Sequence, residues 1–181
     1  MKSTEILNGL QVSLTINRLC FQLIENHNDF SSSVLIGLQP NGIFLANRLK
    51  NSLQDSINNI VSVGSLDITF FRDDFRRKEK PLIPSVTNID FSIENKKVIL
   101  VDDVFFTGRT VRSALDAIMT FGRPSSVEFL TLIERRFVQN IPIKADYIGK
   151  SIDTIKEEKV SVLWKEEHGK DQILLHSPIL K

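Results

Sequence analysis

The chain has 181 residues, of which 41% are hydrophobic and 25% are charged, as in ordinary globular proteins. Its 23 basic and 22 acidic residues give a net charge of +1, so there is no overall electrostatic attraction to nucleic acid. The net charge does not exclude a local basic patch. No apolar stretch approaches ~20 residues, and the N-terminus lacks an apolar leader core, so we expect neither a membrane span nor a signal peptide. The single cysteine, Cys20, cannot form an intramolecular disulfide, which favours a cytoplasmic protein.

The first predicted helix begins after Asn8, whose side chain can cap the helix N-terminus. The side chain of Gln11 can in turn accept a hydrogen bond from the backbone N–H of Asn8, which completes a capping box. Apolar residues then recur at helical spacing, and the pattern fades over residues 26–29. Further on, Gly122 is expected to end the third helix. The remaining predicted elements are strand 33–38, helix 43–53, strand 60–71, strand 98–101, helix 111–118, strand 127–133, and short strands near 145–148, 159–164 and 172–176.

Strands that alternate with helices in this way predict an α/β fold with a mostly parallel sheet and helices on both faces. The length favours one domain over residues 1–181. Residues 72–92 break all periodicity, and Arg72, Asp73 and Asp74 open a charged run that continues to Pro81. A loop of this length is usually functional or disordered, although a charged run by itself is ordinarily a solvated surface.

The most informative segment is residues 98–110, VILVDDVFFTGRT. A fully apolar run ends in Asp102 and Asp103, and a small polar turn at residues 107–110 precedes a helix pattern. Open parallel sheets bind ligands beyond the carboxyl ends of their strands, where a carboxylate can accept hydrogen bonds from ribose hydroxyls. Backbone N–H groups at a helix N-terminus hold phosphate. The pattern therefore predicts a sugar-phosphate site, and simple helix capping is the structural alternative.

This segment resembles the phosphoribosyl-pyrophosphate (PRPP) signature of the type I phosphoribosyltransferases. Residues 67–74, 122–126 and 145–150 resemble one subfamily, the bifunctional pyrimidine-operon regulators that are also uracil phosphoribosyltransferases. The four segments together span most of residues 5–165. The resemblance implies a single-domain twisted sheet flanked by helices, with a mobile lid over about residues 72–92 and a small hood.

The resemblance also implies the roles of the acids and of the turn. Asp102 and Asp103 would be catalytic and approach the ribose hydroxyls, directly or through the water shell of Mg²⁺ carried by PRPP rather than caged by protein. Arg72, in a lid with Asp73 and Asp74, would meet the leaving pyrophosphate. The loop for the 5′-phosphate would be formed by Val104, Phe105, Phe106, Thr107, Gly108, Arg109 and Thr110.

Two further segments depart from the family pattern. Similar proteins contact pyrophosphate with a Lys-Thr-Arg-Gly-like turn, where this chain has Gln39, Pro40, Asn41 and Gly42. Two cations are missing and Pro40 lacks a backbone donor, so we expect weaker pyrophosphate binding, with a plain turn as the alternative. Similar enzymes also bind the base near an acid, an Arg and a Gly. Glu134 and Arg135 match the first two but could equally form a surface ion pair, and Arg136 replaces the Gly.

The leading hypothesis is an enzyme that transfers 5-phosphoribosyl from PRPP to a nucleobase, uracil by the resemblance, giving UMP and pyrophosphate. The second is an RNA-binding attenuator of pyrimidine genes that senses UMP and PRPP, and the third is a nucleotide sensor with poor turnover. Since relatives form dimers, we expect at least a homodimer. Binding to mRNA leaders is expected to be weak, because Lys144 and Lys150 remain but residues expected to be His or Arg in RNA-binding members are Phe21, Asn26, Val138 and Gln139.

Overall fold

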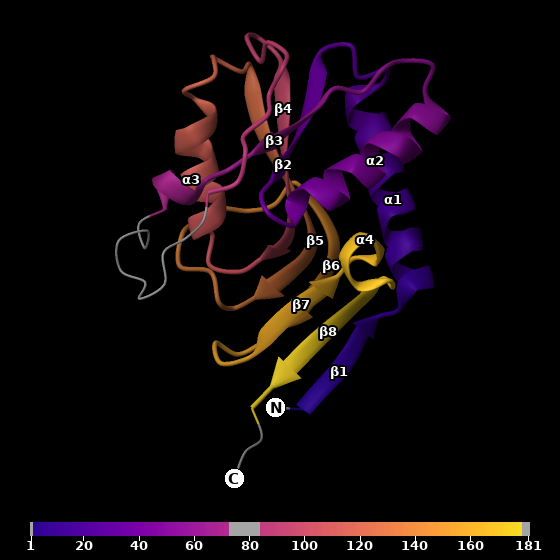
Figure 1. Ribbon diagram of the computed structural model, residues 1–181, viewed down its shortest axis with the longest axis vertical. Helices are drawn as coiled ribbons and strands as arrows, with labels where there is room; N and C mark the ends of the chain where they lie inside the picture. Colours follow the sequence, from indigo (N-terminus) through magenta and orange to yellow (C-terminus); the bar gives the residue numbers. More distant parts are fainter. Residues whose placement is uncertain (1, 73–83, 179–181) are drawn as a thin grey trace.

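The computed structural model describes residues 2–72 and 84–178 of the chain. These residues form a five-stranded parallel sheet, in the order β3-β2-β4-β5-β6, and a three-stranded antiparallel sheet, in the order β1-β8-β7 (Figure 1). The strands are β1 Lys2–Leu7, β2 Ser33–Leu38, β3 Val63–Leu66, β4 Lys97–Phe105, β5 Ser126–Arg136, β6 Tyr147–Asp153, β7 Lys159–Leu163 and β8 Gln172–Ser177. The helices are α1 Gly9–His27, α2 Gly42–Ser56, η1 Thr69–Phe71 (3-10), α3 Arg109–Ile118 and α4 Lys165–His168.

The parallel sheet is covered on both faces, which confirms the predicted α/β architecture. Helices α1 and α2 lie on one face and α3 on the other (Figure 1). Strands that are buried on both faces need continuous apolar runs rather than alternation, and all six residues of β2 are buried. The predicted capping box of α1 is present, since Gln11 N donates to Asn8 Oδ1 and Asn8 N donates to Gln11 Oε1, each at 3.0 Å.

Several predicted boundaries are wrong for local reasons. The strand expected over residues 60–71 covers only β3, because Asp67 Oδ1 accepts hydrogen bonds from the backbone N and the hydroxyl of Thr69, at 3.1 and 2.6 Å, and this turn ends the extended chain. Helix α3 ends at Ile118, before Gly122, and Thr120 Oγ1 donates to the carbonyl of Ala117 at 2.7 Å.

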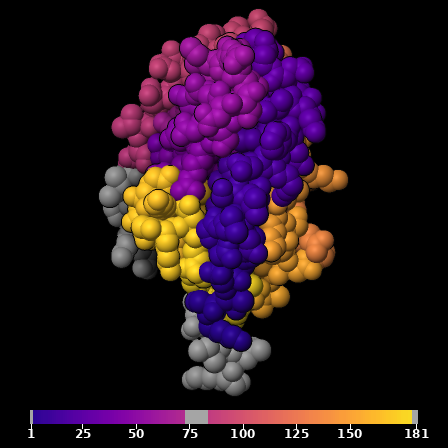
Figure 2. All heavy atoms as spheres, turned by 90° about the vertical axis from the view of Figure 1, so that its right-hand side faces the viewer, coloured from indigo at the N-terminus to yellow at the C-terminus, as the bar shows by residue number. Residues whose placement is uncertain are grey.

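The antiparallel sheet, which we call the hood, lies beyond the carboxyl ends of β5 and β6 (Figure 1). Its strand β1 and the short helix α4 were not predicted, because β1 is mostly exposed and lacks an apolar run. It pairs with β8, so that Lys2 lies opposite Ser177. The yellow C-terminal segment lies beside α1 and α2 in Figure 2, where Arg48 of α2 forms ion pairs with Glu166 and Asp171, each at 2.7 Å.

The segment predicted as a lid is only partly described. Residues 73–83, including Asp73 and Asp74, lie outside the described residues. After them, Asn88 pairs with Ser65 of β3 through two backbone hydrogen bonds of 2.8 and 2.9 Å, so this part of the segment is packed on the sheet. Among the described residues, no helix is both long and apolar enough to cross a membrane.

Candidate active site

Strand β4 brings two acids to the carboxyl edge of the sheet. Asp102 and Asp103 are 8% and 9% exposed, and they follow the strand core without a break. Successive side chains of a strand point in opposite directions, so the two carboxylates meet different partners. Asp102 lines a cavity of about 270 Å³ with Arg72 and the following turn, whereas Asp103 accepts a 3.0 Å hydrogen bond from the side-chain amide of Asn41.

Both acids are electrostatically strained. Burial, followed by the charge of Asp103, raises the pKa of Asp102 well above its usual range, and Arg72 opposes the shift by less. Burial also raises the pKa of Asp103, against the hydrogen bond from Asn41. Two adjacent buried carboxylates resist double ionisation, so the pair favours a cationic or hydrogen-bond-donating ligand that restores its charge.

The turn after β4 leads directly into the N-terminus of α3. Gly108 adopts a left-handed φ of 87° at the N-cap of α3 and has no side chain with which to cap the helix. The backbone N–H of Arg109, the first residue of α3, donates a long 3.5 Å hydrogen bond to the hydroxyl of Thr107, and the helix dipole favours a negative group at this end. Residues 104–111 line the 270 Å³ cavity with Asp102 and Arg72, so the structure brings the predicted phosphate loop, one acid and Arg72 together.

Two phenylalanines of the predicted loop have different surroundings. The ring of Phe105 is buried and packs edge-on against Phe129, with 5.2 Å between ring centroids, so its side chain belongs to the core. The ring of Phe106 faces the guanidinium of Arg135, whose central carbon is 3.9 Å from the ring centroid. Val104 and Phe105 are the last residues of β4 and are not part of the turn.

The predicted pyrophosphate turn joins β2 to α2 beside the acids. The Gln39–Pro40 peptide bond is cis, and Asn41 is the N-cap of α2. Gly42 lies so close to β4 that a Cβ atom there would collide with the carbonyl oxygen of Val101, which explains why glycine is needed. Residues 39–42 carry no cation, and Asn41 contributes a neutral amide, which binds Asp103.

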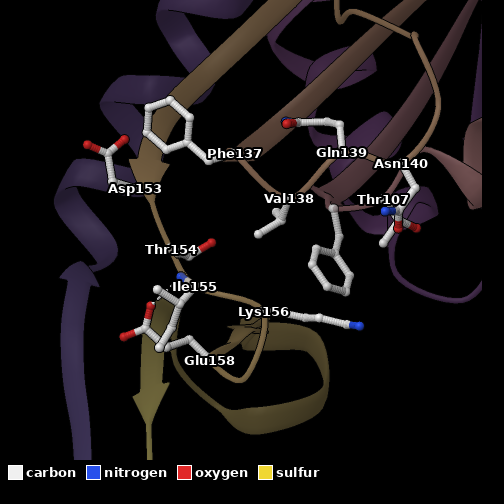
Figure 3. A pocket seen from close by; sticks show the side chains of 11 residues that line it. Thr107, Phe137, Val138, Gln139, Asn140, Asp153, Thr154, Ile155, Lys156 and Glu158 are labelled. Atoms are coloured by element: carbon white, nitrogen blue, oxygen red, sulfur yellow. Dashed lines mark hydrogen bonds between the residues drawn. The ribbon is translucent and has the colours of Figure 1, made fainter.

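A larger cavity of about 580 Å³ adjoins the phosphate loop. It shares Phe106 and Thr107 with the smaller cavity and lies between residues 137–140 and the chain that follows β6. Figure 3 shows Phe137 and Val138 on one side and Thr154 and Ile155 on the other, with the side chain of Lys156 along the lower margin. Four of its eleven lining residues are apolar and the others are polar or charged, and such a mixture can hold a small organic molecule.

The two residues predicted to bind the base do not line this cavity. Glu134 accepts a 2.7 Å hydrogen bond from Ser151 and lines a separate hollow of about 720 Å³ on the other side of residues 137–140. Arg135 is 4% exposed, and its guanidinium donates hydrogen bonds to Thr154 and Ile155, which follow β6. Sequence analysis missed residues 153–158, although they follow the carboxyl end of a parallel strand, the position at which such sheets bind ligands.

The side chains that could bind a metal ion are the acids of β4. Within residues 2–72 and 84–178, no cluster of three or more His, Cys, Asp or Glu side chains could hold an ion. Asp102 lines the phosphate cavity and Asp103 follows it in β4, so two neighbouring carboxylates suit an ion that arrives with its water shell and its phosphate ligands.

The fold and this site define a class of protein. The phosphoribosyl transferase domain model matches residues 2–167. A hypoxanthine phosphoribosyltransferase from Staphylococcus aureus superposes with a TM-score of 0.66 and 20% identity, over 83% of this chain and 77% of that one. The hypoxanthine phosphoribosyl transferase of Trypanosoma cruzi gives 0.67 and 18%, over 83% and 78%. Both solved structures share the fold of the chain.

Sequence similarity is closer to a particular group. "Bifunctional protein PyrR" of Desulfosudis oleivorans is 39% identical, over 98% of this chain and 98% of its own. The proteins of the same name from Gloeothece citriformis and Bacillus subtilis are 42% and 39% identical, over 94% of this chain and 96% and 95% of their own. The chain therefore belongs to the phosphoribosyltransferase family and, within it, to the PyrR group.

Proposed function

We propose that this protein transfers the 5-phosphoribosyl group of PRPP to uracil, forming UMP and releasing pyrophosphate. The observation that carries the proposal is one continuous arrangement at the carboxyl edge of the sheet. Asp102, Arg72 and the N-terminus of α3 line one cavity, Asp103 follows Asp102 in β4, and a second cavity adjoins the first through Phe106 and Thr107. The choice of uracil rests on the PyrR relatives.

The acids would act on the sugar. The bond from C1′ to pyrophosphate breaks, N1 of uracil forms the new bond to C1′, and the N1 proton is lost to solvent. The sugar passes through an oxocarbenium-like state, which nearby fixed negative charge stabilises. Asp102 and Asp103 would also accept hydrogen bonds from the ribose hydroxyls or from the waters of Mg²⁺. When bound, Mg²⁺ supplies positive charge to the leaving pyrophosphate.

The phosphate loop would hold the 5′-phosphate through the backbone N–H groups of residues 107–110 and the hydroxyls of Thr107 and Thr110. Arg72, which lines the same cavity, would bind the leaving pyrophosphate through its guanidinium fork. The neutral turn at residues 39–42 would bind pyrophosphate less tightly than a cationic turn, so we expect a raised KM for PRPP rather than a lost reaction.

A second function is regulation of pyrimidine genes through leader RNA, favoured by the word bifunctional in the names of the relatives. The surface gives it little support. Phe21 and Phe137 are exposed where a basic residue would be needed, Arg18 donates to the carbonyls of Ile148 and Gly149, and Arg136 is paired with Asp153. We propose that RNA binding is weak, about 10⁻⁴ to 10⁻⁶ M at physiological salt, and that the protein works as a cytoplasmic homodimer or larger homo-oligomer.

Two experiments test these proposals. The first measures nucleotide formation from Mg-PRPP with uracil, orotate, hypoxanthine, guanine or adenine, and we expect UMP to be the main product. Absence of product with every base would contradict the enzyme proposal, and another preferred base would correct the substrate. The second titrates leader and scrambled RNA at two salt concentrations, with and without UMP. Nanomolar, sequence-dependent binding strengthened by UMP would make regulation the primary function.

A further inference from the structure

Arg135 is a buried cation whose side chain reaches three parts of the large cavity wall. Its Nε donates to the hydroxyl of Thr154 at 3.0 Å, and a terminal nitrogen donates to the carbonyl of Ile155 at 2.9 Å. The flat face of the guanidinium lies on the ring of Phe106, at 3.9 Å. Its own backbone carbonyl accepts a 2.6 Å hydrogen bond from the side-chain amide of Gln139.

All four partners line the cavity proposed for the base, whereas Arg135 does not. Phe106 follows the last residue of β4. Thr154 and Ile155 follow β6, and Gln139 follows β5 (Figure 3). One side chain therefore joins segments that are far apart in sequence and that must keep a fixed spacing around a flat ligand. A lysine could not replace it, since an ammonium group lacks the planar fork and the flat face.

A contribution to folding stability does not explain why an arginine is buried at position 135. The two oxygen atoms that Arg135 contacts are neutral, and burying a cation on neutral partners is unfavourable compared with an apolar side chain of similar size. Burial is the main cause of a lowered pKa for Arg135, and the charge of Glu158 opposes it from a distance. The next residue, Arg136, is exposed and forms an ordinary surface pair with Asp153 at 2.6 Å.

We infer that Arg135 is a positioning residue, which sets the distance between Phe106 and the Thr154–Ile155 segment and so determines how tightly the nucleobase is held. The inference rests on the proposed function, because it assigns the large cavity to the base. It places Arg135 behind the cavity wall instead of in contact with the base, and it assigns no role to Glu134 in base binding.

The test compares two lysine variants of adjacent residues, Arg135→Lys and Arg136→Lys. For Arg135→Lys we expect the KM for uracil to rise about tenfold or more, since two charge-assisted hydrogen bonds lose their geometry. The KM for PRPP should change by less than about twofold, because the phosphate cavity shares only Phe106 and Thr107 with the larger cavity and contains neither Thr154 nor Ile155. Arg136→Lys should leave both KM values unchanged. A uracil KM unchanged in Arg135→Lys would overturn the inference.

A second measurement does not depend on turnover. Amide hydrogen exchange of the ligand-free proteins should be faster at residues 153–158 in Arg135→Lys than in wild type, with no change in the strands. Faster exchange throughout the protein, or equal exchange at 153–158, would contradict a positioning role. If wild type made no UMP while the local exchange difference was seen, the proposed function would fail and the structural role of Arg135 would stand.

Discussion

The two edges of the central sheet hold their buried polar groups in different ways. At the amino edge, His27 contacts the Ser33 hydroxyl at 2.8 Å, a Glu128 carboxylate oxygen at 3.0 Å and the Tyr147 hydroxyl at 3.1 Å. The Tyr147 hydroxyl donates to the same Glu128 oxygen at 2.7 Å. At the carboxyl edge, two like charges, Asp102 and Asp103, are buried side by side.

This difference separates groups kept for stability from groups kept for chemistry. A buried network stabilises a fold when every member has partners, and a partly satisfied one lowers stability. At the amino edge, every side chain of the His27 network has a hydrogen-bond partner, so the network stabilises the fold. At the carboxyl edge, Asp103 accepts a hydrogen bond from the Asn41 amide and Asp102 accepts one from the backbone N–H of Asp103, while the charge of Arg72 lowers the pKa of Asp102 by less than burial and Asp103 raise it. Such strain is typical of sites that bind a ligand able to relieve it.

The largest expected effect comes from removing the strained charges. In Asp102→Asn with Asp103→Asn, phosphoribosyl transfer should fall by at least about two orders of magnitude, through lost stabilisation of the cationic transition state. The melting temperature should not fall, since the substitution removes two buried like charges. Steady-state kinetics and thermal denaturation of the same preparations check both. Wild-type turnover in the double variant would contradict the ribose assignment.

The amino edge should respond in the opposite way. His27→Ala removes the centre of the closed network and leaves buried partners unsatisfied, so the free energy of unfolding should drop by about 2–4 kcal/mol. The kcat of the remaining folded protein should stay near wild type, because the cluster lies at the far edge of the sheet from Asp102. Tyr147→Phe, which removes one hydroxyl, should lower stability by only about 1 kcal/mol. A large loss of kcat in either folded variant would contradict this separation.

Sequence predicted the carboxyl edge far better than the amino edge. An apolar run that ends in two acids and a glycine turn is local, so β4, Asp102, Asp103 and the turn before α3 could be placed from sequence alone. The His27 network joins residues that are 6 to 120 positions apart in the sequence, so no local sequence pattern predicts it. For the same reason the hood was only partly predicted, since β1 gains its partner from the other end of the chain. Neither Glu134 nor Arg135, the residues predicted to bind the base, lines the 580 Å³ cavity, and the burial of Arg135 depends on partners after β6 that no local pattern indicates.

The pH dependence of stability sharpens the comparison, because the edges have opposite signs. Burial lowers the pKa of His27, so its contribution is present at neutral pH and is lost as the pH falls below about 6.5 towards the lower folded pKa. The pKa of Asp102 is raised, so that pair destabilises the ligand-free protein as the pH rises above about 4. Urea unfolding should show His27→Ala approaching wild type at pH 5. The Asp102→Asn, Asp103→Asn variant should be more stable than wild type at pH 8, and a difference that did not shrink towards pH 5 would contradict the assignment.

The smallest expected effect concerns an ion-pair contact between α2 and the hood. Arg48 binds Glu166 and Asp171 with both arms of its guanidinium and lies 4.8 Å from the centre of the Trp164 ring. Because these charges are partly exposed, Arg48→Met should lower the free energy of unfolding by about 1 kcal/mol, and the difference should shrink in high salt. Arg112→Met is the matched control, since Arg112 forms an ion pair within α3 that is half exposed, and its loss should be smaller still. Urea denaturation at low and high salt measures both. A loss in Arg48→Met that persisted in high salt would mean that packing on Trp164, and not the ion pairs, holds the hood in place.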